Sequence, residues 1–175
     1  MRATRTRERG AALVEFALLM PLLVMLILGI VSVGIAYNHQ LSLTHAARET
    51  ARYAATLPVE NFASKSAWLD EVAAQAIANG TGTLDDGVPG RVVCVAYVYP
   101  QGTTTGTDPT ERRLDDGSGS LVRDASPCFA DGRPDTERRV QVTVARESDF
   151  NVIVFTQTLT LDSEAVSRFE AALGS

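Results

Sequence analysis

One uninterrupted apolar run near the N-terminus constrains this 175-residue chain more than any other feature. The run extends from Ala11 to Tyr37 and contains a single charged residue, Glu15. A helix needs about 20 apolar residues to cross the roughly 30 Å of hydrocarbon in a bilayer. The run exceeds that length, so we expect one transmembrane helix.

The charges on either side of the run predict its orientation. Four arginines precede it and are offset by one glutamate, whereas the next arginine or lysine after it is Arg48. The positive-inside rule then makes residues 1–10 a basic cytoplasmic leader, which we expect to be disordered, and sends the rest of the chain outward. The predicted location is the cytoplasmic (inner) membrane, crossed once, with an extracytoplasmic C-terminal domain.

A nearly continuous helix is expected over residues 11–57. Its only proline is Pro21, and Pro58 disfavours the helical conformation of the residue before it. The more polar second half, from about residue 38 to 57, would project from the membrane as a stalk.

Three alanines on this stalk share one helical face. Ala47, Ala51 and Ala55 are spaced by four residues, and small residues at that spacing let helices approach closely. Alanine is also simply the strongest helix former. The three alanines are therefore explained either by a helix-packing seam or by helix propensity alone.

Residues 58–175 predict a small α+β domain. An apolar stripe predicts a helix at 64–79, with Ser64 or Ser66 as its cap and Gly80 in a left-handed conformation after its end. The single tryptophan, Trp68, is expected to lie between this helix and a sheet. The stripe consists of Leu69, Val72, Ala73, Ala76 and Ile77.

Alternating and β-branched segments predict the sheet. We expect strands at 91–99, 139–146 and 152–161, the last two joined by residues 147–151 as an antiparallel hairpin. The composition of residues 100–137 predicts a long loop with a short strand near 121–122. We expect a helical turn at residues 163–172. The fold class is therefore α+β: a long N-terminal transmembrane and stalk helix, then one helix on an antiparallel sheet of three or four strands.

The two cysteines, Cys94 and Cys128, both follow the predicted span. Outside the cytoplasm such a pair can form a disulfide. The bond would tie the long loop to the strand that contains Cys94 and stabilise the folded state by about 3–4 kcal/mol. The alternative is two free thiols in a core. Because no histidine lies near either cysteine in the sequence, we do not expect a zinc site.

Other sequence features give no sign of catalysis. The net charge of −5 argues against a nucleic-acid partner, and the chain has no nucleophile elbow, phosphate-binding loop or paired metal-binding histidines. His39 and His45 lie six residues apart and do not share a helical face. We expect no enzymatic activity, no cofactor and no metal.

The peptide Leu-Asp-Asp-Gly occurs twice, at residues 84–87 and 114–117. Asp-Gly is a turn signal, so we expect a turn at each copy. Calcium binding by Asp85–Asp86 or by Asp115–Asp116 is the alternative, although neither loop has the spaced oxygen ligands of an EF-hand.

Glu15 is the anomaly in the apolar run. A carboxylate at the bilayer centre costs about 2.5–3.5 kcal/mol on insertion scales and less near the edge. Glu15 either lies close to the headgroups at modest cost or requires a cation at membrane depth. A new α-amino group, created by cleavage just before the span, would supply that cation.

The segment from Arg9 to Leu23 (RGAALVEFALLMPLL) resembles the N-terminus of TadE-like proteins, the pseudopilins or minor pilins of tight-adherence Flp pilus systems. The resemblance implies that a membrane prepilin peptidase cleaves after Gly10 and makes Ala11 the new N-terminus. Glu15 then occupies mature position five, and Phe16 replaces the tyrosine usual in major Flp pilins. It also implies roles in Flp/Tad pilus assembly, secretion and adhesion, with other pilus subunits and the inner-membrane assembly platform as partners.

Two other protein classes fit the same sequence. One is a secreted protein whose signal peptide is cleaved before Tyr37, since Gly34 and Ala36 are small residues at the positions that signal peptidase reads. The other is an uncleaved single-span protein that carries an external binding domain. The residue at the mature N-terminus distinguishes them: Ala11 for a pseudopilin, Tyr37 for a secreted domain and Met1 for an uncleaved anchor.

Overall fold

The computed structural model describes the chain except for residues 1–3, 99–109, 119, 134–137, 153–154 and 170–175. It divides into two compact units, residues 1–37 with 149–159, and residues 38–148 with 160–175. In chain order the elements are α1 (Thr4–Thr56), a 3-10 turn (Val59–Asn61), α2 (Lys65–Asn79), β1 (Val92–Val98), β2 (Glu111–Asp115), β3 (Leu121–Asp124), β4 (Arg139–Val152) and β5 (Phe155–Arg168).

The long N-terminal helix is present, and it begins earlier than the apolar run. α1 starts at Thr4, so residues 4–10 are helical and the expectation of a disordered leader is wrong for them. Pro21 is accommodated inside the helix. The helix ends at Thr56, two residues before Pro58, as the proline predicts.

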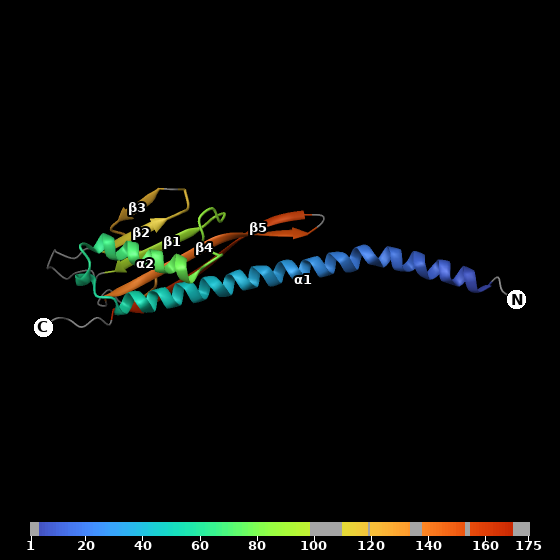
Figure 1. The fold of residues 1–175 in the computed structure, drawn as a ribbon, viewed down its shortest axis with the longest axis horizontal. Helices are drawn as coiled ribbons and strands as arrows, with labels where there is room; N and C mark the ends of the chain where they lie inside the picture. The colour runs from blue at the N-terminus through green and yellow to red at the C-terminus, as the bar shows by residue number, and fades with distance from the viewer. Residues whose placement is uncertain (1–3, 99–109, 119, 134–137, 153–154, 170–175) are drawn as a thin grey trace. The chain divides into compact units, whose positions relative to one another are not determined.

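Five strands form one sheet in the order β3-β2-β1-β4-β5 (Figure 1). β1 lies at the centre and pairs antiparallel with both β2 and β4, with Cys94 opposite Leu114 on one side and Thr143 on the other. Residues 93–98 are all buried. A strand buried at every residue but its first must be covered on both faces of the sheet, as its unbroken apolar sequence predicts.

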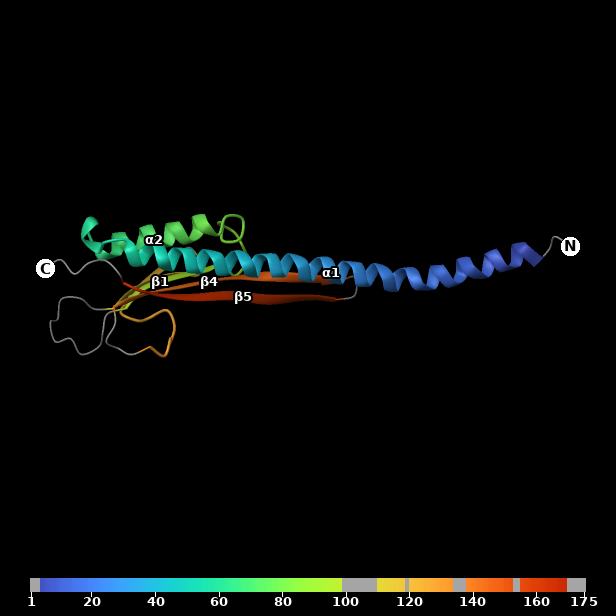
Figure 2. The same ribbon diagram turned by 90° about the horizontal axis from the view of Figure 1, so that it is seen from below.

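Helices cover one face of the sheet within the second unit. α2 and residues 38–56 of α1 lie on the same side of the strands (Figure 2). Ala47, Ala51 and Ala55 are almost fully buried, which favours the packing seam over plain helix propensity. The expectation that this part of α1 projects as a free stalk is therefore wrong, because its small-residue face is a packing surface.

Polar contacts fix α1 against the elements around it. Asn79 at the end of α2 donates a hydrogen bond of 3.2 Å to the buried hydroxyl of Thr50. Thr83 donates to Ser42 at 3.1 Å. The Gln40 side chain donates to the backbone carbonyl of β5 at residue 162, at 2.8 Å.

α2 begins and ends close to the predicted residues. The Ser64 hydroxyl accepts a hydrogen bond from the backbone of Ala67, so Ser64 is the N-cap. Gly80 follows the helix, but its φ of −98° is not left-handed, which corrects the predicted cap geometry. A Cβ at this position would lie 2.6 Å from Leu84, so the close approach of Leu84 accounts for the glycine.

Trp68 lies between α2 and the sheet, as predicted. It is fully buried, and its ring meets the Tyr97 ring edge-on with centroids 5.9 Å apart. Its indole N–H donates to the carbonyl of Leu57 at 3.1 Å. The indole therefore ties the end of α1 to the centre of the sheet, and its polar atom is satisfied.

The opposite face of β1 is covered by an irregular segment, residues 126–131. Cys94 and Cys128 form a disulfide with a Cα–Cα distance of 5.9 Å, so the predicted pairing is confirmed. Gln141 on β4 is fully buried, accepts from the backbone N–H groups of Cys128 and Phe129, and donates to the carbonyl of Phe129. One covalent bond and one side-chain amide thus hold this segment on the sheet.

Several strand boundaries differ from the sequence prediction. β2 lies in the segment expected to be loop, although the short strand near 121–122 is confirmed as β3. Residues 147–151 belong to β4 and do not form the hairpin connection, and residues 163–168 extend β5 where a helical turn was expected. The sheet has five strands because pairing with β1 recruits the charged sequence of β2, which has no apolar alternation of its own.

Candidate processing and assembly segment

The Gly10–Ala11 peptide bond lies inside α1, in the second turn of the helix. Glycine destabilises a helix interior by about 1 kcal/mol relative to alanine. The predicted cleavage position is thus a locally weak point in the helix.

Glu15 follows Ala11 by four helical residues. Side chains at this spacing lie one above the other on one face of a helix. An amine uncovered at Ala11 would therefore lie one turn below the Glu15 carboxylate. Glu15 is exposed, and none of the side chains that the structure describes pairs with it.

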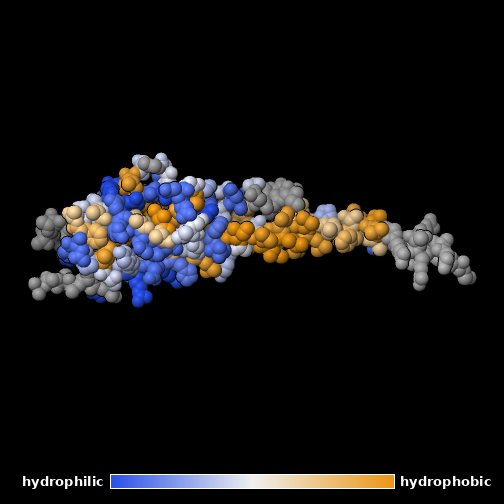
Figure 3. Space-filling view, viewed as in Figure 1, coloured by the Kyte–Doolittle hydropathy of each residue, from blue (hydrophilic) through white to orange (hydrophobic). Residues whose placement is uncertain are grey.

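The surface of α1 after Glu15 is apolar and uncovered. Figure 3 shows a continuous band of apolar side chains along this part of the helix. Phe16 is 55% exposed, Leu18 is 75% exposed, and the apolar window of α1 is unburied throughout. A helix that is apolar all round and exposed to water is not stable as such, so it requires lipid or other helices around it. By length and composition, α1 can cross a membrane.

A family model described as TadE-like protein matches residues 10–52. Residues 10–52 are TadE-like. This finding confirms the resemblance read from the sequence. The TadE-like segment contains Gly10, Ala11, Glu15 and Phe16, and it continues into the part of α1 that packs on the sheet. No curated protein and no solved structure gives a significant match.

The domain that follows the TadE-like segment contains two glycine turns of identical sequence. Gly87 and Gly117 have φ values of +84° and +74°, so the turn interpretation of both Leu-Asp-Asp-Gly peptides is confirmed. Arg91 joins the two turns, since its guanidinium lies 2.8 Å from Asp86 and 3.0 Å from Asp115. Arg91 thus pairs with one carboxylate of each acidic pair, and among the described residues neither turn gathers three acidic, histidine or cysteine side chains as a metal site.

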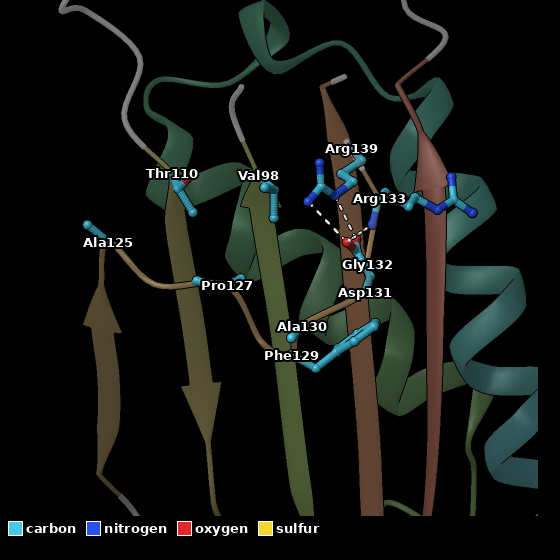
Figure 4. Close-up of a pocket in the computed structure, with 10 residues that line it drawn as sticks. All are labelled: Val98, Thr110, Ala125, Pro127, Phe129, Ala130, Asp131, Gly132, Arg133 and Arg139. Carbon is cyan, nitrogen blue, oxygen red and sulfur yellow. Dashed lines mark hydrogen bonds and ion pairs between the residues drawn. The ribbon is translucent and has the colours of Figure 1, made fainter. Parts of the chain in front are cut away.

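A second buried ion pair lies where β4 begins (Figure 4). Arg139 and Asp131 meet at 2.6 Å with side chains only 6% and 5% exposed. Gln141 and the backbone N–H of Arg133 also donate to Asp131. Burial raises the pKa of Asp131, but the hydrogen bonds from Gln141, Arg133 and Arg139 outweigh it and hold the pKa below its usual value.

A cavity of about 240 Å³ opens beside this ion pair. Both carboxylate oxygens of Asp131 already accept hydrogen bonds. Among the described residues that line the cavity, Asp131 is the only carboxylate, and its oxygens are therefore already engaged. Its lining residues are Val98, Thr110, Ala125, Pro127, Phe129, Ala130, Asp131, Gly132, Arg133 and Arg139 (Figure 4).

The predicted site residues fall into two separate places. Gly10, Ala11, Glu15 and Phe16 lie along one stretch of α1, whereas Cys94 lies on β1 and Cys128 lies in the irregular segment that is bonded to it. His39 is half-buried and His45 exposed. Within the described part of the chain, no three histidine, cysteine or acidic side chains gather as a metal site.

Sequence reasoning missed the buried charges that organise the domain. Arg91 and Arg139 each flank an apolar strand, a position that usually indicates an exposed strand end. Their buried acidic partners are distant in the sequence, because Asp115 is the last residue of β2 and Asp131 lies in an irregular segment. The only sequence signal was the repeated Leu-Asp-Asp-Gly peptide. It pointed to Asp86 and Asp115 but not to Arg91, which pairs with both.

Proposed function

We propose that this chain is a TadE-like pseudopilin, a minor pilin of a Flp/Tad pilus system. It is inserted once in the cytoplasmic membrane with its N-terminus in the cytoplasm, cleaved after Gly10 by a prepilin peptidase, and used in pilus biogenesis, secretion and adhesion. One observation carries the proposal. A lone carboxylate, Glu15, lies one helical turn after the Gly10–Ala11 bond, in a helix surface that is otherwise apolar and matches the TadE-like family.

Processing requires the helix to open at the cleaved bond. The Gly10–Ala11 bond is helical, whereas a protease must reach the backbone of its substrate. Gly10 favours opening because it weakens the helix and has no side chain to exclude the backbone from a narrow active site. The arginines of the leader stay on the cytoplasmic side until the cut separates them from the span.

Cleavage supplies the cation that Glu15 lacks. The new α-ammonium of Ala11 lies at the spacing of adjacent turns from Glu15, in the same subunit or in a neighbour that packs alongside. A buried carboxylate is costly alone but tolerable when paired. Pairing therefore lets the mature helix leave the lipid for a bundle of apolar helices, and it fixes the register between subunits.

The role proposed for the C-terminal domain is structural and not enzymatic. As a minor subunit it would cap, initiate or decorate the filament, in contact with other Tad/Flp pilus subunits and the inner-membrane assembly platform. The disulfide and the buried ion pairs hold the loops of this external domain in place. No cofactor is needed for that role.

The test is the intact mass and N-terminal sequence of the native protein, taken from membranes and from sheared filaments. We expect a chain that begins at Ala11 and whose mass rises on reduction by the two hydrogens of one disulfide. A native chain that begins at Met1 would identify an uncleaved anchor and overturn the proposal. A chain that begins at Tyr37 would identify a secreted domain and overturn it as well.

A further inference from the structure

The two cysteines of the disulfide differ in their access to solvent. Cys94 lies on the central strand β1, between Leu114 on β2 and Thr143 on β4, and is only 3% exposed. Cys128 is half-buried and lies in residues 126–131, which cover this face of β1 from outside. A reagent dissolved in water therefore reaches Cys128 more easily than Cys94.

Hydrogen bonds also hold the backbone of Cys128 on the sheet. Its N–H and that of Phe129 donate to the side-chain oxygen of Gln141 at 3.0 and 3.4 Å, and the Gln141 amide donates to the Phe129 carbonyl at 3.0 Å. Gln141 lies opposite Ala96, two residues along β1 from Cys94, so the side chains of Gln141 and Cys94 share one face of the sheet. Because these hydrogen bonds do not depend on the S–S bond, we expect them to hold Cys128 beside Cys94 in the reduced chain as well.

Formation of the bond needs an oxidant but no choice of partner. The chain contains two cysteines, so only one intramolecular pairing exists. A disulfide forms when a thiolate attacks the sulfur of a donor disulfide, which gives a mixed disulfide that a second thiolate then resolves. The donor must reach the first thiol from solvent, whereas the second thiol has only to reach the first. The half-buried Cys128 suits the first role, and the buried Cys94 suits the second.

We propose that an extracytoplasmic disulfide donor oxidises this chain through Cys128. The Cys128 thiolate attacks one sulfur of the donor disulfide, which breaks the donor S–S bond and releases one donor thiol. The Cys94 thiolate then attacks the Sγ of Cys128 and releases the second donor thiol. The two protons lost by the cysteines end on the two donor thiols, and the donor gains the two electrons that the chain loses.

The buried amide of Gln141 is a positioning residue for the second attack. Cys94 cannot move to meet the mixed disulfide, because β1 is paired on both sides. Gln141 brings the mixed disulfide to Cys94 by holding the backbone of Cys128. The inference rests on the extracytoplasmic location within the proposed function, since disulfide donors act outside the cytoplasm. It adds an order of events, in which residues 126–131 dock on β1 before the bond closes.

Two single-cysteine variants of the full-length protein in detergent test the entry through Cys128. Oxidised glutathione is the donor, and intact mass follows the glutathione adduct. Cys94→Ala retains Cys128, and Cys128→Ala retains Cys94 as its matched control. We expect the adduct to form at least about tenfold faster in Cys94→Ala, and at similar rates in concentrated urea, where neither thiol is buried. Equal rates in the folded variants, or a faster Cys128→Ala, would overturn the inference.

The unsubstituted protein gives a second measurement that does not depend on how the variants fold. Reduced glutathione attacks the native disulfide by the reverse of the second step, and an acid quench followed by alkylation in urea marks the released thiol. Peptide mapping should find glutathione on Cys128 and the alkyl group on Cys94, at least about tenfold more often than the reverse. Glutathione mainly on Cys94 would contradict the proposed order. Adduct on neither cysteine, here and in Cys94→Ala alike, would show that Cys128 is not accessible and reject the order as well.

Gln141→Met tests the positioning role, because it removes the amide and keeps a side chain of similar length. Starting from the reduced chain and oxidised glutathione, we expect the Cys128 adduct to form at the native rate and to close to the disulfide at least about tenfold more slowly. Thr143→Val is the matched control on the same strand and face, since the buried Thr143 hydroxyl has no hydrogen-bond partner. Native closing rates in Gln141→Met would reject the positioning role.

These measurements are independent of the proposed pilus function. They use neither a membrane nor a filament, so their failure leaves the cleavage after Gly10 untouched. A native chain that begins at Tyr37 would reject the pseudopilin but not the order of attack on the cysteines. The fluorescence of the single buried Trp68 verifies that each variant is folded before its rate is compared.

Discussion

The Arg91 guanidinium lies 3.0 Å from the Asp115 carboxylate, with side chains only 9% and 12% exposed. Arg91 also donates to the carbonyl of Leu84 at 3.4 Å and pairs with the exposed Asp86. A single side chain therefore connects the turn after α2 to the turn after β2. These two turns share a peptide sequence but lie 30 positions apart in the chain.

We expect Arg91→Leu to destabilise the domain by about 3–5 kcal/mol. The substitution leaves the Asp115 carboxylate buried with one hydrogen bond from the backbone N–H of Gly117 and a 3.8 Å contact to Arg113, and a buried charge without a close ionic partner is costly. Urea unfolding of the full chain in detergent, followed by the fluorescence of the single tryptophan, measures the change.

Asp86→Asn is the matched control for Arg91→Leu. It removes the other carboxylate partner of Arg91, but the Asp86 side chain is 96% exposed. Exposed ion pairs contribute little, so we expect no measurable loss of stability. Equal losses in the two variants would show that burial of the Arg91–Asp115 pair is not the cause.

Protonation of Asp131 should lower the stability of the domain in acid. Its folded-state pKa lies below the usual 3.8, because the hydrogen bonds to its carboxylate outweigh the effect of burial. A depressed pKa contributes stability above the unfolded-state value, and that contribution is lost as the pH falls through the folded-state value. The loss should therefore occur below about pH 4.

Asp131→Asn isolates this contribution because asparagine does not titrate. We expect the variant to be less stable than the native protein near neutral pH and the difference to shrink as the pH falls below about 4. The measurement is urea unfolding at a series of pH values, with the difference between the two proteins plotted against pH. A difference that stays constant across the series would exclude Asp131 as the titrating group.

Gly10→Val should block maturation. A branched side chain at this position excludes the backbone from a narrow protease site, so we expect an unprocessed precursor that stays in the membrane. Intact mass of the membrane fraction measures this outcome. Ala12→Val, two residues further along, is the control and should be processed normally. A mature-size product from Gly10→Val would place the cut elsewhere.

Glu15→Val should leave membrane insertion intact and impair assembly. The variant removes the partner of the new Ala11 amine, and breaking a buried pair costs about 3–5 kcal/mol. We therefore expect at least a tenfold loss of the subunit from sheared filaments, since about 1.4 kcal/mol corresponds to a factor of ten. The measurement is the ratio of subunit in filaments to subunit in membranes.

Val14→Leu, the neighbouring position, changes the apolar surface without removing a charge and serves as the control for Glu15→Val. Glu15→Asp keeps the charge on a shorter side chain and should retain part of the assembly. Normal filament incorporation of Glu15→Val would reject pairing as the assembly mechanism.

Local patterns accounted for the elements whose residues carry a strong period. The apolar run predicted α1, and the serines at 64 and 66 predicted the start of α2, of which Ser64 is the cap. The alternation of Val140, Val142 and Val144 predicted a strand whose apolar side is fully buried. The local sequence pattern failed to predict a strand where pairing with a neighbouring strand overrides composition. β2 reads Glu-Arg-Arg-Leu-Asp and is a strand because it lines up against β1.

The sequence alone determined that this protein has an apolar helix with a basic leader, a lone glutamate one turn after a glycine bond, and two cysteines beyond the span. These are properties of neighbours along the chain, and helical spacing converts them directly into a shared face. The tertiary structure decided which distant charges meet, since Arg91 reaches Asp115 and Arg139 reaches Asp131 only after the sheet has formed. It also decided that the polar half of α1 is packed, because burial depends on what lies opposite a face and not on the residues of that face alone.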